Sequence, residues 1–170
     1  MNPTHLMNNK QIAIIGGGPV GITAALLLQN KGARVTLYER DASLEAGITG
    51  GSLDIHQHTG QLALKEAGIL DAFYQISWPA SERMLTKDGR VFSEDLVPEP
   101  TKHFKPEIDR NDFRRLLCRP LKEGVVVWNR KLISLDEHQG KYRLHFDGEL
   151  PRPPTSSLGP TGVCPKSALF

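Results

Sequence analysis

The feature that most restricts the possible folds of this chain is a glycine-rich segment near its N-terminus. Gly16, Gly18 and Gly21 follow the apolar run Gln11–Ile15 and open an Ala- and Leu-rich stretch over residues 20–31. The apolar run predicts a buried parallel strand, and the stretch after it predicts a helix. In this setting the first glycine permits a tight turn and the second lets a pyrophosphate approach the backbone. The third, Gly21, lets the helix pack close to the strand.

A second strand with a terminal acid follows the predicted helix. Residues 34–39 carry the β-branched and aromatic side chains of a strand and end at Glu39. Strand, turn, helix and strand together predict a βαβ unit with a right-handed crossover. An acid at this position accepts hydrogen bonds from the ribose hydroxyls of a dinucleotide and disfavours the 2′-phosphate of NADP. NAD and FAD both stay open, although the mixed stretch 41–120 argues against a plain NAD-binding fold.

The remaining chain predicts short helices and strands. We expect a loop over 41–51, helices near 59–67 and 71–75, and a hairpin whose turn is Lys87-Asp88-Gly89-Arg90. Residues 108–110 are predicted to be extended, with Asn111 or Asp112 capping a helix that runs to about residue 117. Residues 125–128, 131–135 and 141–146 are strand candidates, and the last two form a small antiparallel meander. The fold class is therefore α/β, with a parallel sheet and inserted helices.

Composition excludes several other classes of protein. A net charge of +2, from 21 basic and 19 acidic residues, leaves no broad basic surface for nucleic acid. Cys118 and Cys164 are too few and too far apart for a disulfide framework, and His56 and His58 have no third metal ligand at a supporting spacing. No apolar stretch is long enough to cross a bilayer, and residues 1–9 lack the features of a signal peptide. We therefore expect a cytoplasmic protein that binds no metal, nucleic acid or membrane.

Four segments together resemble one family, the class A flavoprotein monooxygenases, and within it the Tet(X)-type tetracycline-inactivating enzymes. The segments are IAIIGGGPVG (12–21), YERD (38–41), GGSLDIH (50–56) and IDRNDFR (108–114), which stand in the family's order. The resemblance runs from about residue 10 to residue 148. It implies a Rossmann-like FAD-binding domain over residues 10–150 that is partial, since the family's substrate domain is absent from this sequence.

The resemblance also implies a cofactor site. Its cofactor-binding residues would be Gly16, Gly18, Gly21, Glu39, Arg40, Asp54 and Arg110. Of these, Arg40 would lie along the adenine of a non-covalently bound FAD. In the family, NADPH reduces the flavin, which then activates O₂ to hydroxylate a small-molecule substrate, so the chemistry belongs to the cofactor. This sequence has Gly47 where the family carries an arginine associated with NADPH, which weakens the expectation of NADPH. We assign no catalytic residue.

The last twenty residues differ from the rest. Residues 151–170 hold five prolines and no Asp or Glu, and they show no helical or alternating apolar period. Such a segment predicts disorder. A family strand, Ala-Asp-Leu-Val-Ile-Gly-Ala-Asp-Gly, can be coded so that reading one nucleotide later gives residues 154–162 as they stand. We therefore expect a frameshift near residue 150, which a gene sequence incompatible with such coding would exclude.

Three functions are compatible with the sequence. The first is a truncated member of the FAD-dependent monooxygenase family that is inactive by itself, and the second is a non-catalytic FAD- or nucleotide-binding module. The third is a fragment of an NAD-dependent dehydrogenase, which the segments around Glu39 and Arg110 disfavour. In the intact family the substrate would be a tetracycline-like small molecule, and the folded chain is expected to be monomeric.

Overall fold

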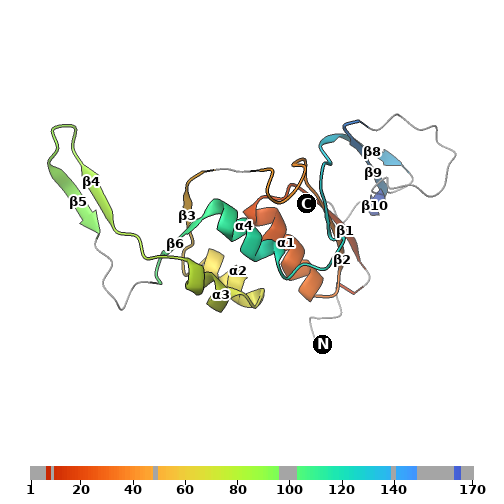
Figure 1. The fold of residues 1–170 in the computed structure, drawn as a ribbon. Coiled ribbons are helices and arrows are strands. Elements are labelled where there is room, and N and C mark those ends of the chain that lie inside the picture. Colours follow the sequence, from red (N-terminus) through yellow and green to blue (C-terminus); the bar gives the residue numbers. More distant parts are fainter. Residues whose placement is uncertain are drawn as a thin grey trace. The chain divides into compact units, whose positions relative to one another are not determined.

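The computed structural model describes residues 7–8, 10–47, 50–95, 103–138, 141–148 and 163–165. They belong to two compact units, of which the first is Met1–Ile48 with Leu117–Phe170 and the second is Thr49–Leu116. The fold is α/β and begins with a βαβ unit, as the sequence predicted (Figure 1). None of the described helices combines the length and the apolar character that a membrane span requires.

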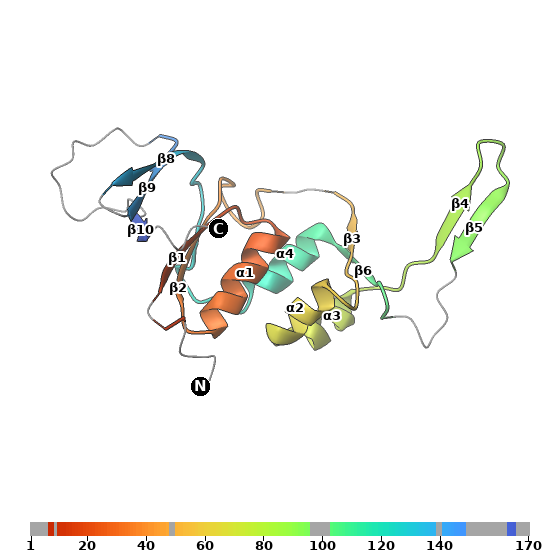
Figure 2. The ribbon, with the colours of Figure 1, turned by 180° about the vertical axis from the view of Figure 1, so that it is seen from behind.

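A parallel sheet with one helix forms the start of the first unit. Its elements are β1 (Gln11–Ile15), α1 (Pro19–Asn30), β2 (Arg34–Tyr38) and β7 (Val126–Val127). The strand order is β1-β2-β7, and both pairings are parallel. Figure 2 shows α1 lying against β1 and β2. The helix buries Ile22, Ala25 and Leu26, and β2 buries Leu37 completely, so this contact forms the core of the unit.

The limits of α1 follow from its first and last residues. Pro19 occupies the first turn, where a helix has no use for the missing N–H. Gly32, expected to end the helix, has a φ of +83°, a left-handed conformation that glycine adopts without strain. Beyond it, the N–H of Ala33 donates to the carbonyl of Leu28 at 3.0 Å. The chain therefore reverses direction tightly between α1 and β2, which places β2 beside β1.

An antiparallel sheet completes the described part of the first unit. β8 (Leu132–His138) and β9 (Lys141–Phe146) form the predicted meander, and β10 (Val163–Pro165) pairs with the other edge of β9. The ring of Phe146 lies 4.7 Å from that of Tyr38, centroid to centroid. The other residues of 151–170 lie outside the described ranges, so the disorder expected for this segment stays a prediction.

The second unit contains two short sheets and most of the remaining helices. Its elements are β3 (Ser52–Asp54), α2 (Gly60–Glu66), α3 (Leu70–Ile76), β4 (Glu82–Leu85), β5 (Val91–Asp95), β6 (Glu107–Asp109) and α4 (Arg110–Cys118), whose last two residues belong to the first unit. The hairpin β4–β5 has the predicted turn, with Gly89 at a φ of +82°. The sequence did not predict β3, which pairs antiparallel with β6.

A buried glutamine holds the two segments that flank the β3–β6 pair. The side-chain amide of Gln61, which is 2% exposed, donates to the carbonyls of Ile55 and His103, each at 2.7 Å. Its carbonyl oxygen accepts a hydrogen bond from the Tyr74 hydroxyl at 2.6 Å. Ile55 directly follows β3 and His103 precedes β6 in the chain, so this polar cluster fixes both strands. Phe73 and Ile108, both fully buried, pack in the same unit.

Candidate functional site

Three loops of the first unit begin at the same edge of its parallel sheet. Because β1, β2 and β7 run in one direction, the residues after Ile15, Tyr38 and Val127 all emerge at the carboxyl edge. The loops are 16–18, 39–41 and 128–130. In open α/β sheets this edge is where ligands bind. Five of the seven predicted site residues lie in these loops or at the start of α1.

Two of the motif glycines are required by the fold itself. Gly16 has a φ of +104°, which side chains rarely adopt, and its N–H donates to the Tyr38 carbonyl at 2.8 Å. At Gly21 a Cβ atom would lie 2.0 Å from the Gly16 carbonyl oxygen and 3.5 Å from Cγ2 of Ile14. The tight turn and the close approach of helix and strand, both expected from the sequence, are therefore present.

Gly18 differs from these two glycines. Its φ of −75° suits any residue, and a Cβ atom there would meet nothing within 4 Å. It is also the N-cap of α1, where it provides no side chain to cap the helix, and the first turn holds no acidic residue. The N–H groups and the positive end of the helix dipole are thus left for an anion. The open space beside Gly18 fits a phosphate group that approaches the backbone.

Glu39 lies at the centre of the carboxyl edge. Its side chain is buried, with the residue 7% exposed. One carboxylate oxygen accepts a hydrogen bond from the N–H of Gly17, and the other accepts one from the N–H of Asp41 at 2.9 Å. Each carboxylate oxygen keeps a second lone pair that can accept a hydrogen bond from a hydroxyl group. The arrangement therefore fits a ribose next to the glycine loop, and the negative charge opposes a phosphate at the same place.

The third loop was not recognised from the sequence. The N–H of Glu39 donates to the Val127 carbonyl at 3.0 Å, and the N–H of Arg130 donates to the Glu39 carbonyl at 2.7 Å. Asn129 has a φ of +55° and donates its N–H to the Asp41 carbonyl at 2.8 Å. These backbone bonds fix both ends of the 39–41 loop. Asn129 is the sequence feature that could have predicted this loop, because asparagine adopts the left-handed conformation more readily than most residues.

Arg40 is exposed beside Glu39, so its side chain is accessible at the carboxyl edge. The structure thus brings Gly16, Gly18, Gly21, Glu39 and Arg40 together in the first unit. Asp54 and Arg110 belong to the second unit.

In the second unit, Asp54 and Arg110 lie near opposite ends of the β3–β6 pair. Asp54 is exposed and pairs with Glu107, while the N–H of Arg110 donates to the Gly51 carbonyl at 3.2 Å. Arg110 is the exposed first residue of α4. One turn later, Arg114 is buried at 8% exposure. The unit therefore presents one predicted acidic residue at the end of β3 and one predicted basic residue at the start of α4.

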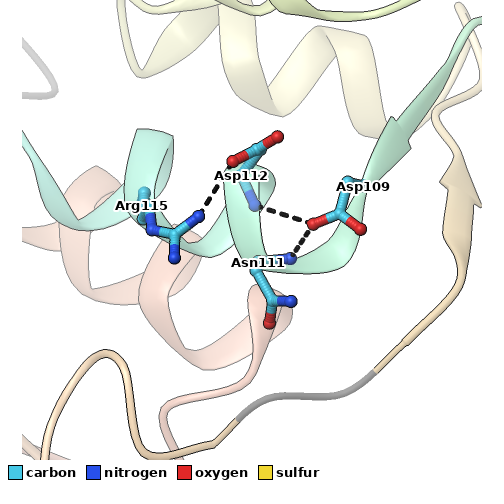
Figure 3. A network of polar contacts seen from close by, with 4 residues as sticks. All are labelled: Asp109, Asn111, Asp112 and Arg115. Carbon is cyan, nitrogen blue, oxygen red and sulfur yellow. Dashed lines mark hydrogen bonds and ion pairs between the residues drawn. The ribbon is translucent and has the colours of Figure 1, made fainter.

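The cap of α4 differs from the sequence prediction. We expected Asn111 or Asp112 to cap the helix, but the carboxylate of Asp109 accepts the N–H groups of both, at 2.8 and 3.2 Å (Figure 3). Asp112 instead pairs with Arg115 at 3.0 Å on an exposed face. The helix begins earlier than predicted because the last residue of β6 already supplies the capping oxygen. Arg110 is therefore part of the helix and not of the strand.

Comparison with known proteins identifies the family of this chain. The sequence model of the FAD dependent oxidoreductase family matches residues 11–99, which include β1, α1, β2 and Glu39. The chain belongs to the FAD dependent oxidoreductase family. The chain is 29% identical to a curated relative, the monooxygenase penA of Penicillium thymicola. The match extends over 132 residues, which are 74% of this chain and 29% of penA.

Solved structures with a similar fold include a tetracycline destructase and a p-nitrophenol 4-monooxygenase. The tetracycline destructase Tet(55) superimposes with a TM-score of 0.65 at 21% identity, over 97% of this chain and 38% of Tet(55). The p-nitrophenol 4-monooxygenase PnpA of Pseudomonas putida DLL-E4 gives 0.60 at 21% identity, over 82% of this chain and 36% of PnpA. The chain thus spans roughly a third of the length of the proteins it matches.

Proposed function

We propose that this chain forms the FAD-binding part of a flavin-dependent monooxygenase, with the adenosine end of FAD at the carboxyl edge of β1, β2 and β7. The observation that carries the proposal is the contrast among the motif glycines. The fold requires glycine at Gly16 and Gly21, whereas at Gly18 only an approaching ligand would require it. The buried carboxylate of Glu39 lies next to the same loop.

Each residue of the site then has a physical role. The N–H groups of the first turn of α1 bind the pyrophosphate, and Glu39 accepts hydrogen bonds from the ribose hydroxyls. The exposed side chain of Arg40 lies along the adenine. That Asp54 and Arg110 also bind the cofactor is proposed from the sequence resemblance alone. Bound FAD supplies the redox chemistry, and the residues of this chain bind and orient it.

The proposed reaction is the hydroxylation of a tetracycline-like small molecule, with NADPH as the reductant. The likeness in fold to Tet(55) supports this substrate class, and Gly47 makes NADPH the least supported part of it. The chain spans 29% of penA and 38% of Tet(55). That the isolated chain is inactive stays a prediction from the sequence. The monomeric state and cytoplasmic location predicted from the sequence remain predictions.

A titration of the full chain with FAD tests the proposal. Flavin absorbance and fluorescence are followed for the wild type and for Gly18→Val, and thermal unfolding is measured for both. We expect FAD to bind the wild type and not the variant. Since a Cβ atom at this position meets nothing within 4 Å, the variant should still fold. A wild type that folds and does not bind FAD would refute the proposal.

A non-catalytic nucleotide-binding module is the second candidate, because the residues at the carboxyl edge bind or orient a nucleotide and none of them has an assigned catalytic role. Such a module would bind FAD at the same site. It would not oxidise NADPH in the presence of tetracycline, even after addition of a second polypeptide that corresponds to the rest of a relative such as Tet(55). A preference for NAD over FAD in competition would instead indicate a dehydrogenase fragment. FAD binding together with tetracycline-dependent NADPH consumption after that addition would support the monooxygenase.

A further inference from the structure

Asn129 is the one residue other than glycine with a positive φ in the described part of the chain, at +55°. It is exposed, and its loop follows β7 at the carboxyl edge of the parallel sheet. We propose that Asn129 is a specificity-determining residue, whose side-chain amide recognises the edge of the adenine base. The proposal rests on the proposed function, since it concerns the adenosine end of the same site. It extends that site from the first two strands of the sheet to the third.

The order of the strands places the three parts of a nucleotide at three loops. In the order β1-β2-β7, the phosphate-binding loop follows β1, and Glu39, proposed to bind the ribose, follows β2. Neighbouring strands lie about 4.8 Å apart, so the three loops stand side by side along the edge. Phosphate, ribose and base are joined in that order. A nucleotide with its phosphates at β1 and its ribose at β2 therefore extends its base toward the end of β7, where Asn129 lies.

Backbone hydrogen bonds fix Asn129 beside the loop that contains Glu39. The N–H of Asn129 donates to the Asp41 carbonyl at 2.8 Å, and that of Arg130 donates to the Glu39 carbonyl at 2.7 Å. Between these two acceptors stands Arg40, which is exposed and is proposed to lie along the face of the adenine. The edge of the same base is then left to the facing loop, whose central residue is Asn129.

The side chain of Asn129 has the chemistry for this contact. A carboxamide carries a donor and an acceptor, and adenine presents the matching pair, its 6-amino group beside a ring nitrogen. Asparagine in the left-handed conformation often bonds its side chain to nearby backbone. Within the described part of the chain, however, the side chain of Asn129 makes no hydrogen bond. Glycine would adopt the same conformation without strain, so the fold does not account for the amide.

Competition of ADP and of purine riboside 5′-diphosphate with FAD on the full chain tests the contact. The second nucleotide lacks only the 6-amino group. In the wild type we expect ADP to bind about fivefold more tightly, which corresponds to one hydrogen bond between neutral groups. In Asn129→Gly the two nucleotides should bind equally, to within about twofold. This variant should fold, because glycine accepts the left-handed conformation.

Two further variants separate recognition of the base from other effects. Asn129→Asp keeps an acceptor for the 6-amino group, so a preference for ADP of about threefold or more should remain. Both nucleotides should bind this variant more weakly, because its carboxylate adds a negative charge at the site. Glu39→Gln changes the ribose contact and should weaken both nucleotides alike, so that the preference stays at about fivefold.

Two results would overturn the inference while leaving the FAD site intact. One is a wild type that binds FAD and ADP but does not prefer ADP over purine riboside 5′-diphosphate. The other is an Asn129→Gly variant that keeps the full preference of the wild type. A wild type that binds neither FAD nor ADP would overturn the proposed function itself, and this inference with it.

Nuclear magnetic resonance observes the side-chain amide of Asn129 directly. Its two N–H resonances, identified by their absence in Asn129→Gly, should shift when ADP is added to the wild type. Pyrophosphate alone should leave them in place, because it occupies only the loop after β1. Equal shifts with both additions, or no shift with ADP, would refute the contact.

Discussion

Replacing Gly21 by alanine should destabilise the first unit, because the added atom collides with backbone. The new Cβ would lie 2.0 Å from the Gly16 carbonyl oxygen and 3.2 Å from its carbon. A normal carbon–oxygen contact needs about 3.3 Å, so the first turn of α1 must move by roughly 1.3 Å away from β1. Neither partner is a side chain that could change its rotamer.

The expected cost follows from two opposing effects. Overpacking of this kind costs about 1–3 kcal/mol or more, whereas alanine in place of glycine in a helix gains about 0.5–1 kcal/mol. Because a 2.0 Å contact with backbone lies at the upper end of the overpacking range, we expect a net loss of about 2 kcal/mol, a sizeable part of the roughly 5–15 kcal/mol that stabilises a domain. For a chain of this size each kcal/mol lowers the melting temperature by about 2–4 °C.

Thermal and urea unfolding of the full chain, followed by circular dichroism, measure this effect. The matched control is Gly18→Ala, which adds the same atom three residues earlier in open space and should cost less than about 1 kcal/mol. Both variants should bind FAD more weakly than the wild type. The free energy of unfolding, and not the FAD affinity, therefore distinguishes Gly21→Ala from Gly18→Ala. A Gly21→Ala variant as stable as the wild type, or more stable, would refute the close contact of α1 with the glycine turn.

Three further changes test other parts of the structure. At the left-handed Asn129, valine should cost about 1–2 kcal/mol in urea unfolding, whereas glycine should cost almost nothing; equal costs would contradict the conformation. Gln61→Leu should cost about 1–3 kcal/mol, because the buried contact to the Ile55 carbonyl and the part-buried contact to the His103 carbonyl both lose their donor; a loss below about 0.5 kcal/mol would contradict the cluster. Burial, and after it the negative charge of Asp71, raise the pKa of the Tyr74 hydroxyl. In a pH titration the phenolate absorbance of Tyr74 should therefore appear at a higher pH than that of an ordinary tyrosine, and Asp71→Asn should lower the midpoint of this titration. Because the folded state holds this proton more tightly, its contribution to stability is full below about pH 10 and is lost as pH rises through the folded-state pKa; a Tyr74 midpoint at or below 10 would contradict the shift.

The local elements of the fold were predictable from the sequence. Strand β1, helix α1, strand β2 and the β4–β5 hairpin each carry their own signal, either an apolar run, a terminal glycine or an Asp-Gly turn. Strand β3 carries none, because it has three residues and pairs with residues more than fifty positions later. The Asp109 cap was missed for the same reason, since it depends on where β6 ends.

The candidate site shows the same division. The motif predicted Gly16, Gly18, Gly21 and Glu39, and the structure places them at one edge of the sheet. The 128–130 loop was not predicted, because it meets Glu39 and Asp41 through backbone groups that every residue possesses. Side-chain chemistry can be inferred from a sequence, whereas backbone pairing between distant segments requires the fold.

The pairing of β2 with β7 has a consequence for how the protein is made. About 90 residues separate the paired positions, and at about 5–20 residues per second β2 waits on the order of ten seconds for its neighbour to be synthesised. Closing so long a loop costs about 4 kcal/mol of chain entropy, apart from a constant. The β3–β6 pair and the Arg110–Gly51 bond, however, bring distant residues of the insert together. If they form first, only about 30 residues remain to be closed and the cost falls by about 1 kcal/mol. Early folding of the second unit would thus speed assembly of the first.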